Sequence, residues 1–203
     1  MPSRNTTEPA ARATSATATE HAAPGAPAQT APQTNGDSLR SKAGANTRPS
    51  TRAVAILTQA GVPFKVRAFK TDGSLPYGIG AAKALGVDPA LVFKTLLAKV
   101  DGRIWCAIVP VEAQLDLKAL AKAAGGKKAV MASAVEAQRA TGYVVGGISP
   151  LGQRQEHPTL IDVAALDLDV MMVSAGARGM DVALAPTDLE RLTGARYAPI
   201  SRL

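Results

Sequence analysis

Apolar and polar side chains follow two different periods in the first part of the chain that can form a core. Val54, Leu57 and Ala60 recur at helical spacing, and Gly61 follows them as a natural helix end. Residues 62–69 then alternate between apolar and polar side chains, which predicts a strand. The folded part of the chain is therefore expected to begin with a helix followed directly by a strand.

The rest of the pattern predicts a hairpin and a series of short elements. Two apolar runs, 94–100 and 103–111, flank Asp101 and Gly102, and an Asp-Gly pair in this position is typical of a β-hairpin. Further helices are expected at 77–86, from Asp88, and at 114–126, 133–142 and 187–194, and further strands at 129–133, 159–166, 170–176, 180–186 and 195–200. Hairpins mixed with short helices favour an α+β domain whose sheet is curved into a partial barrel.

Two of the predicted helices have sequence signals at their first residues. Ser133 is followed by Glu136, and Thr187 by Glu190. This is the spacing of a capping box, in which both side chains bond to backbone N–H groups of the first turn. We therefore expect Ser133 and Thr187 to be the N-caps of their helices.

The first fifty residues have a different composition from the rest. Residues 13–38 contain no aliphatic side chain larger than alanine, so they cannot bury enough apolar surface to offset the entropy of ordering. We expect residues 1–50 to be a disordered tail and residues 51–203 to be one domain. A transit peptide is a weaker alternative, because acidic residues interrupt the segment. No run of about 18 apolar residues is present, so we expect no membrane span and a cytoplasmic protein.

The charge of the chain favours polyanionic partners. Lys and Arg number 23 against 16 Asp and Glu, a formal charge of +7, which points first to nucleic acid. A solvated basic surface without a partner is an equal alternative. Aromatic residues make up only 3% of the chain, which argues against a platform that stacks single-stranded bases.

The residues that most often carry covalent or metal chemistry are few. Cys106, the one cysteine, lies within an apolar run, where a thiol usually behaves as a small buried hydrophobe. His21 falls in the predicted tail and His157 in a loop, so a tetrahedral zinc site cannot be assembled from them and the cysteine. No Ser-His-Asp order is evident. We expect neither a metal nor a cofactor.

Three features remain as candidates for a site. Lys94 enters an apolar strand, where a lysine either extends outward to solvent or is held as a fixed positive charge, and the pattern alone favours the first. The glycine-rich loop over 141–153 exposes backbone N–H groups that suit a carbonyl oxygen or a phosphate. Residues 173–181 combine Ser174 and Asp181 with two glycines, although a simple glycine-rich hairpin explains them equally well.

Four segments together closely resemble the YbaK/EbsC family of aminoacyl-tRNA deacylases. They are VFKTLLAKVDG, QLDLKALAKAAGGKKA, TGYVVGGISPLGQ and VSAGARGMDVAL, in the family's order, and the resemblance extends from Thr51 to Arg202. It implies an α+β fold with a mixed, barrel-like β-sheet and peripheral helices. It also implies hydrolysis of the ester that joins a wrong amino acid to tRNA(Pro), with cysteine as the amino acid and its own thiol assisting the attack.

The same resemblance implies which residues form the site. The catalytic positions fall on Lys94, Gly146 and Asp181, and the substrate-binding positions on Tyr77, Thr95, Gly147, Ser174 and Gly176. Family members often have a tyrosine where this chain has Phe69. The expected partners are aminoacylated tRNA(Pro) and prolyl-tRNA synthetase. Two alternatives stay open: a deacylase for alanine or another small amino acid, and a non-catalytic module that binds tRNA or a synthetase. The oligomeric state is also left open.

Overall fold

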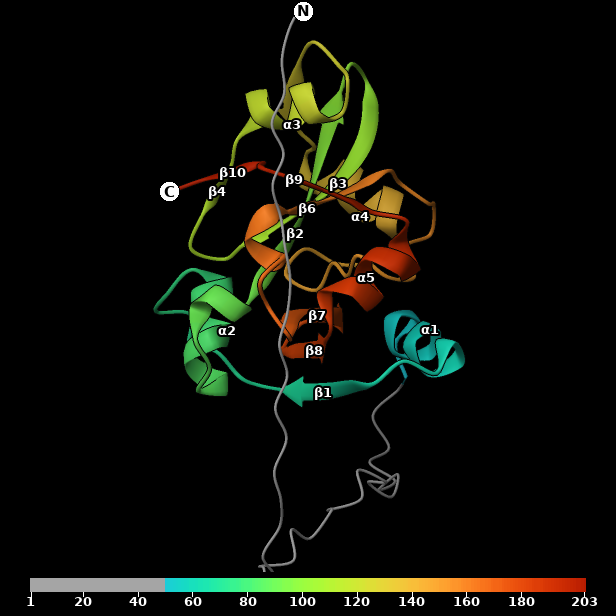
Figure 1. Ribbon diagram of the computed structural model, residues 1–203. Coiled ribbons are helices and arrows are strands. Elements are labelled where there is room, and N and C mark those ends of the chain that lie inside the picture. Colours follow the sequence, from blue (N-terminus) through green and yellow to red (C-terminus); the bar gives the residue numbers. More distant parts are fainter. Residues whose placement is uncertain (1–49) are drawn as a thin grey trace, which may run out of the picture. The chain divides into compact units, whose positions relative to one another are not determined.

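A five-stranded mixed sheet is the largest element of the computed structural model, which describes residues 50–203 (Figure 1). The disordered tail predicted for residues 1–50 lies outside the described residues, apart from Ser50. In spatial order the strands are β5 (Ala129–Met131), β2 (Phe93–Val100), β3 (Arg103–Pro110), β6 (Thr159–Asp162) and β9 (Arg196–Ala198). β2 and β3 form the predicted antiparallel hairpin around Asp101, whereas β6 and β9 are added in parallel. The predicted mixed sheet is therefore confirmed.

Two smaller antiparallel sheets complete the β-structure of residues 50–203. The first has the order β1 (Phe64–Ala68), β8 (Met180–Leu184) and β7 (Met171–Ala177), and the second pairs β4 (Gln114–Leu115) with β10 (Ser201–Arg202). An isolated bridge between Val92 and Met172 joins the first of these to the region where β2 begins. The α+β class is confirmed, but the sheets of this part of the chain do not close into a barrel.

Short helices cover the sheets, and four of the five α-helices of residues 50–203 end at a predicted glycine. The helices are α1 (Arg52–Ala60), α2 (Tyr77–Leu85), α3 (Leu117–Ala123), α4 (Ala134–Thr141) and α5 (Pro186–Thr193), with 3-10 turns η1 (Pro89–Leu91) and η2 (Val163–Ala165). Gly61 and Gly86 have the left-handed conformation that terminates α1 and α2. The capping box of Ser133 and Glu136 is present at α4.

Several predicted boundaries are wrong, and two of them have a clear local reason. The helix predicted over 114–126 begins only at Leu117, after β4, and the helix predicted from Asp88 is only the 3-10 turn η1. α5 begins at Pro186 with Ala185 as its N-cap and no capping side chain, so Thr187 lies inside the first turn. Proline is favoured at that first position because its φ angle already suits a helix. The strand predicted over 159–166 ends at Asp162, whose carboxylate accepts a hydrogen bond from the Ala164 N–H and turns the chain into η2.

The core lies where the larger sheets meet α1 and α5. Leu57 of α1, Leu189 of α5 and Ile161 of β6 are completely buried in it. Cys106 is also completely buried, and burial raises the pKa of its thiol to about 12, so its predicted role as a core residue is confirmed. Among residues 50–203 no helix has the length and apolar character needed to cross a bilayer.

Candidate functional site

A cavity of about 460 Å³ opens among α2, β2, α4 and the β7–β8 hairpin. Most of its lining is apolar, and six of the eight residues implied by the family resemblance border it: Tyr77, Lys94, Thr95, Gly146, Ser174 and Asp181. These residues come from four separate segments of the chain, which extend from Tyr77 to Asp181. The structure therefore brings the predicted cationic, carboxylate and glycine positions to one cavity.

Lys94 and Asp181 are the two ionisable groups of this cavity that face an unfavourable environment. Burial lowers the pKa of the Lys94 ammonium, which donates a hydrogen bond of 3.2 Å to the Val111 carbonyl. Burial also raises the pKa of the Asp181 carboxyl to about 6. The two do not pair with each other, because the ion pairs of residues 50–203 are Lys99–Glu136 and Arg191–Asp188. Each of the two groups is thus desolvated without an oppositely charged partner, an arrangement found often at functional sites.

Ser174 and Asp181 lie side by side across the β7–β8 ladder. They are direct partners in the antiparallel register, so their side chains project from the same face of the sheet. The Ser174 hydroxyl accepts a hydrogen bond from the Gly176 N–H at 3.3 Å. No hydrogen bond in the described part of the chain engages the Asp181 carboxylate, although its side chain is buried. The pair therefore offers a hydroxyl and an uncompensated carboxyl to a ligand.

The glycine loop reaches the cavity through a tight turn at Gly146. The Gly147 N–H donates to the Val144 carbonyl at 2.9 Å, and Gly146, at the third position of this turn, has φ 86°. Positive φ at that position is the mark of a type II turn and favours glycine. Within residues 50–203 the Gly146 N–H donates to no acceptor, whereas that of Gly147 is already used. Of the two adjacent glycines that follow Val145, Gly146 is consequently the one whose amide is free to meet a ligand.

Gly147 and Gly176, predicted to bind substrate, do not line the cavity. A Cβ atom on Gly147 would lie 2.8 Å from the backbone of Ala177 and Arg178. A Cβ atom on Gly176 would lie 2.7 Å from the Tyr143 ring. Both glycines therefore allow the loop and the β7–β8 hairpin to pack closely, and a contact of either with substrate stays a prediction.

Four side chains hold the glycine loop in place. Val145 is bound from both sides, since its N–H donates to Gln138 Oε1 of α4 and its carbonyl accepts from Arg178 Nε. The Tyr143 hydroxyl donates to the Leu151 carbonyl at 2.8 Å and so links the two ends of the loop. The Arg52 guanidinium lies 4.5 Å from the centre of the Tyr143 ring. The position of Gly146 is thus determined by α1, α4 and the β7–β8 turn together.

Tyr77 connects α2 to the turn between β7 and β8. Its hydroxyl accepts a hydrogen bond from the Gly179 N–H at 2.6 Å, and its ring packs against Phe69 with centroids 6.1 Å apart. Tyr77 is 40% exposed and borders the cavity. Thr95, on β2, has a buried hydroxyl for which the described residues provide no partner.

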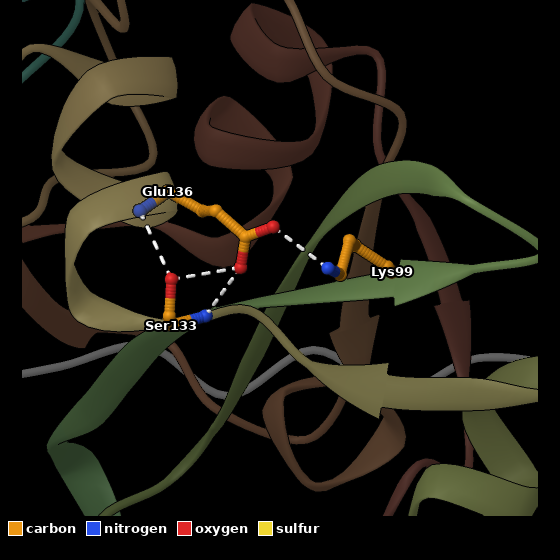
Figure 2. A network of polar contacts seen from close by, with 3 residues as sticks. All are labelled: Lys99, Ser133 and Glu136. Atoms are coloured by element: carbon orange, nitrogen blue, oxygen red, sulfur yellow. Dashed lines mark hydrogen bonds and ion pairs between the residues drawn. The ribbon is translucent and has the colours of Figure 1, made fainter.

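A polar network fixes α4 against β2 on the other wall of the cavity. Lys99 Nζ lies 2.7 Å from Glu136 Oε1, and the second oxygen of Glu136 accepts from the backbone and hydroxyl of Ser133 (Figure 2). These contacts lower the pKa of Glu136 to about 2, with the Lys99 hydrogen bond as the largest cause. Because α4 supplies Ala134 and Ala137 to the lining, the network helps to set the width of the cavity.

The cysteine and the histidine of residues 50–203 lie away from this cavity. Cys106 is enclosed in the core, and His157 borders a separate cavity of about 600 Å³ near β3 and α5. The groups that do meet here are a cation, a free backbone N–H, the hydroxyls of Thr95 and Ser174, and a carboxyl. This set can polarise a carbonyl group and hold an ammonium or hydroxyl group, and the lining contains no histidine that could activate a serine or threonine hydroxyl.

Sequence reasoning missed several residues that shape the site. Tyr143 and Arg178 position the loop, and the Val111 carbonyl holds Lys94. Ala134 and Ala137, spaced three apart on α4, leave room for the cavity. The spacing of these two alanines was the one signal in the sequence that could have indicated a cavity wall. The roles of Val111 and Arg178 could not be predicted, because each bonds to a residue that is distant in sequence.

Comparisons with known proteins give the site a context. Residues 80–192 match the family described as aminoacyl-tRNA editing domain. EbsC of Enterococcus faecalis, named as a Cys-tRNA(Pro)/Cys-tRNA(Cys) deacylase, is 35% identical over 157 residues, 76% of this chain and 95% of that protein. ProXp-y of Escherichia coli, named as a multifunctional Ser/Thr-tRNA deacylase, is 28% identical over 146 residues, 70% of this chain and 86% of that protein.

A solved structure described as a trans-editing enzyme for prolyl-tRNA synthetase has a similar fold. It matches this chain with a TM-score of 0.68 and 25% sequence identity, and the match covers 77% of this chain and 99% of the other. The match therefore includes nearly all of that protein.

Proposed function

Since the chain belongs to the aminoacyl-tRNA editing domain family, we propose that it hydrolyses the ester of a mischarged tRNA(Pro), with cysteine as the amino acid removed. The observation that carries this proposal is the convergence of Lys94, the free Gly146 N–H and Asp181 on one mostly apolar cavity. Two relatives with names that specify aminoacyl-tRNA deacylation support the reaction class.

The positive side of the cavity would act on the ester carbonyl. During attack the carbonyl oxygen gains negative charge, and the Gly146 N–H together with the Lys94 ammonium would stabilise it. Removal of one such donor typically costs about 3–4 kcal/mol in the barrier, so each group is expected to matter strongly. The Val111 carbonyl keeps Lys94 within the cavity and prevents it from extending to solvent.

The negative side of the cavity would hold the rest of the aminoacyl adenosine. The Asp181 carboxylate suits the α-ammonium group of the amino acid, and the Ser174 hydroxyl suits a ribose hydroxyl. Binding of the ammonium would supply the partner that Asp181 lacks in the described residues. Substrate binding would therefore favour the ionised form of this carboxyl.

The substrate itself would supply the nucleophile. Because Cys106 is enclosed and its thiol has a pKa raised to about 12, the cysteine of this chain is unsuited to attack. The thiol of a cysteinyl ester, once deprotonated, can attack its own carbonyl carbon, and the ribose oxygen then leaves and takes up a proton. Water would complete the hydrolysis of the resulting thioester.

A small amino acid without a thiol is the second candidate substrate. The name of the Escherichia coli relative specifies serine and threonine, and its similarity to this chain covers the same domain. For alanine, serine or threonine a bound water would have to attack. The apolar lining of the cavity favours the thiol side chain over a hydroxyl, because an unpaired hydroxyl is costly to bury.

A panel of mischarged tRNAs tests the proposal. Purified protein is mixed in excess with Cys-, Ala-, Ser- and Pro-tRNA(Pro), and the ester remaining is measured over time. The fastest loss is expected for Cys-tRNA(Pro), with Pro-tRNA(Pro) left intact. If none of the esters is hydrolysed even at high protein concentration, the enzymatic function is contradicted and a module that only binds tRNA or a synthetase is favoured.

The proposed partners and location follow from this reaction. The substrate is aminoacylated tRNA(Pro), and prolyl-tRNA synthetase, which makes the error, is the protein expected to deliver it. We expect the reaction in the cytoplasm, where aminoacyl-tRNA is used.

A further inference from the structure

A group of basic residues gathers around α3, away from the cavity residues described above. It consists of five exposed residues: Lys118 and Lys122 on α3, Lys127 and Lys128 between α3 and β5, and Arg196 of β9. Arg196 reaches this group because its guanidinium donates to the carbonyl of Ala123, the last residue of α3. These five residues are called the α3 patch below.

We propose that the α3 patch binds the phosphate backbone of the tRNA next to its 3′ end while the ester occupies the cavity. This inference rests on the proposed function, because it places the substrate of that reaction. Lys and Arg that contact phosphates supply most of the affinity of proteins for nucleic acid without reading its sequence. The five cations therefore suit a partner that is recognised first by its charge.

The charges of the α3 patch are only partly offset within residues 50–203. None of the five forms an ion pair, since the ion pairs there are Lys99–Glu136 and Arg191–Asp188. The adjacent carboxylates, Asp101 and Asp116, accept hydrogen bonds from backbone N–H groups of Lys127, Lys128 and Lys118. Five cations against these two carboxylates leave a surplus of positive charge at this end of the domain.

The arrangement on the helix is also unfavourable for the free protein. Lys118 and Lys122 are four residues apart in α3, so their ammonium groups project from the same face and repel each other. Lys127 and Lys128 add two further cations in consecutive positions. A polyanion would convert these repulsions into favourable contacts.

The α3 patch lies within reach of the cavity through β5. Lys128 directly precedes β5, and Met131, the last residue of that strand, lines the cavity. Three residues of strand at about 3.3 Å each span about 10 Å. Met131 is 45% exposed, so the end of the strand that borders the cavity is open to solvent. A few nucleotides suffice to cover this distance, which suits a chain whose terminal ester is in the cavity.

Paired substitutions test the α3 patch. Lys127→Ala with Lys128→Ala removes two cations without changing the backbone groups bound to Asp101. The matched control is Lys65→Ala with Lys70→Ala, two exposed lysines of the β1 segment, which Figure 1 places at the other end of the domain from α3. A third variant, Lys127→Arg with Lys128→Arg, keeps the charge.

Two measurements are made on each variant. The first is the dissociation constant for uncharged tRNA at several salt concentrations. The second is deacylation of mischarged tRNA and of the same aminoacyl ester of adenosine, which has no phosphate backbone. For the alanine variant of the α3 patch we expect at least fivefold weaker tRNA binding and a slope of log affinity against log salt that is shallower by about two. KM for tRNA should rise with kcat unchanged, and hydrolysis of the adenosine ester should be unaffected.

The other outcomes separate this inference from the proposed function. Unchanged tRNA binding by the alanine variant would overturn the inference, even if the ester is hydrolysed. An equal loss in the β1 control, or failure of the arginine variant to restore binding, would overturn it as well. If weaker binding is found but the wild-type protein hydrolyses no ester, the α3 patch is supported and the proposed function fails.

Discussion

Replacement of Asp181 by asparagine should make the protein more stable at neutral pH and less active. The Asp181 carboxyl is buried, and desolvation raises its pKa from the ordinary value of 3.8 to about 6. In the window between these values the folded protein keeps a proton that the unfolded chain has released, so stability falls as pH rises through it. At roughly 1.4 kcal/mol for each unit of pKa, the full penalty is about 3 kcal/mol above pH 6.

The assay is chemical unfolding of wild type and Asp181→Asn at about pH 4 and about pH 8. The neutral amide avoids the penalty, so we expect the variant to gain about 3 kcal/mol at the higher pH and only a few tenths at the lower one. Asp169→Asn, at an exposed carboxylate, should show no such difference. The reasoning is refuted if Asp181→Asn has the same relative stability at both pH values, or is less stable than wild type at pH 8.

Activity should change in the opposite direction. If the ionised Asp181 binds the α-ammonium group, kcat/KM of the wild type should rise with pH through about 6 and then level off. Asp181→Asn should lower kcat/KM by at least tenfold and remove this rise. The ionised Asp181 carboxylate would thus lower the free energy of unfolding while it serves the binding of substrate.

Three further substitutions test other parts of the site. Gly146→Val forces a β-branched residue to a φ of 86° and places side-chain atoms near the cavity, so it should reduce deacylation by more than tenfold and destabilise the fold by about 1–3 kcal/mol, both measurable in one preparation. Tyr143→Phe removes the hydrogen bond between the loop ends and should cost about 1–2 kcal/mol in urea unfolding; an unchanged midpoint would reject its anchoring role. The wild-type Glu136 carboxylate has its pKa lowered to about 2 and stabilises the fold only while it is ionised, so the free energy of unfolding should fall as pH falls from 4.5 towards 2. In Glu136→Gln the free energy of unfolding should depend less on pH over this range.

The parts of the fold that were predictable from sequence are those set by local patterns. The Asp101-Gly102 hairpin, the glycine ends of α1 and α2, and the capping box at Ser133 each depend on residues close in the chain. The wrong N-cap at Thr187 shows the limit of this approach. Two local signals competed there, and Pro186 started the helix two residues earlier than a Thr187 N-cap would.

The candidate site was predictable only in part. The resemblance selected Lys94 and Asp181, but periodicity alone favoured a Lys94 that extends to solvent. The structure shows instead that the Val111 carbonyl retains its ammonium. Gly146 and Gly147 are equivalent in sequence, and only the turn hydrogen bond from Gly147 to Val144 distinguishes the free amide from the occupied one. Such distinctions depend on contacts between distant segments.

The most direct measurement is the single-turnover rate of Cys-tRNA(Pro) hydrolysis by wild type and Lys94→Ala, with Lys65→Ala as the exposed-lysine control. If the Lys94 ammonium stabilises the charge that develops on the ester oxygen, Lys94→Ala should be slower by about a hundredfold, while the control stays within twofold of wild type. A Lys94→Ala rate equal to that of wild type would contradict the account.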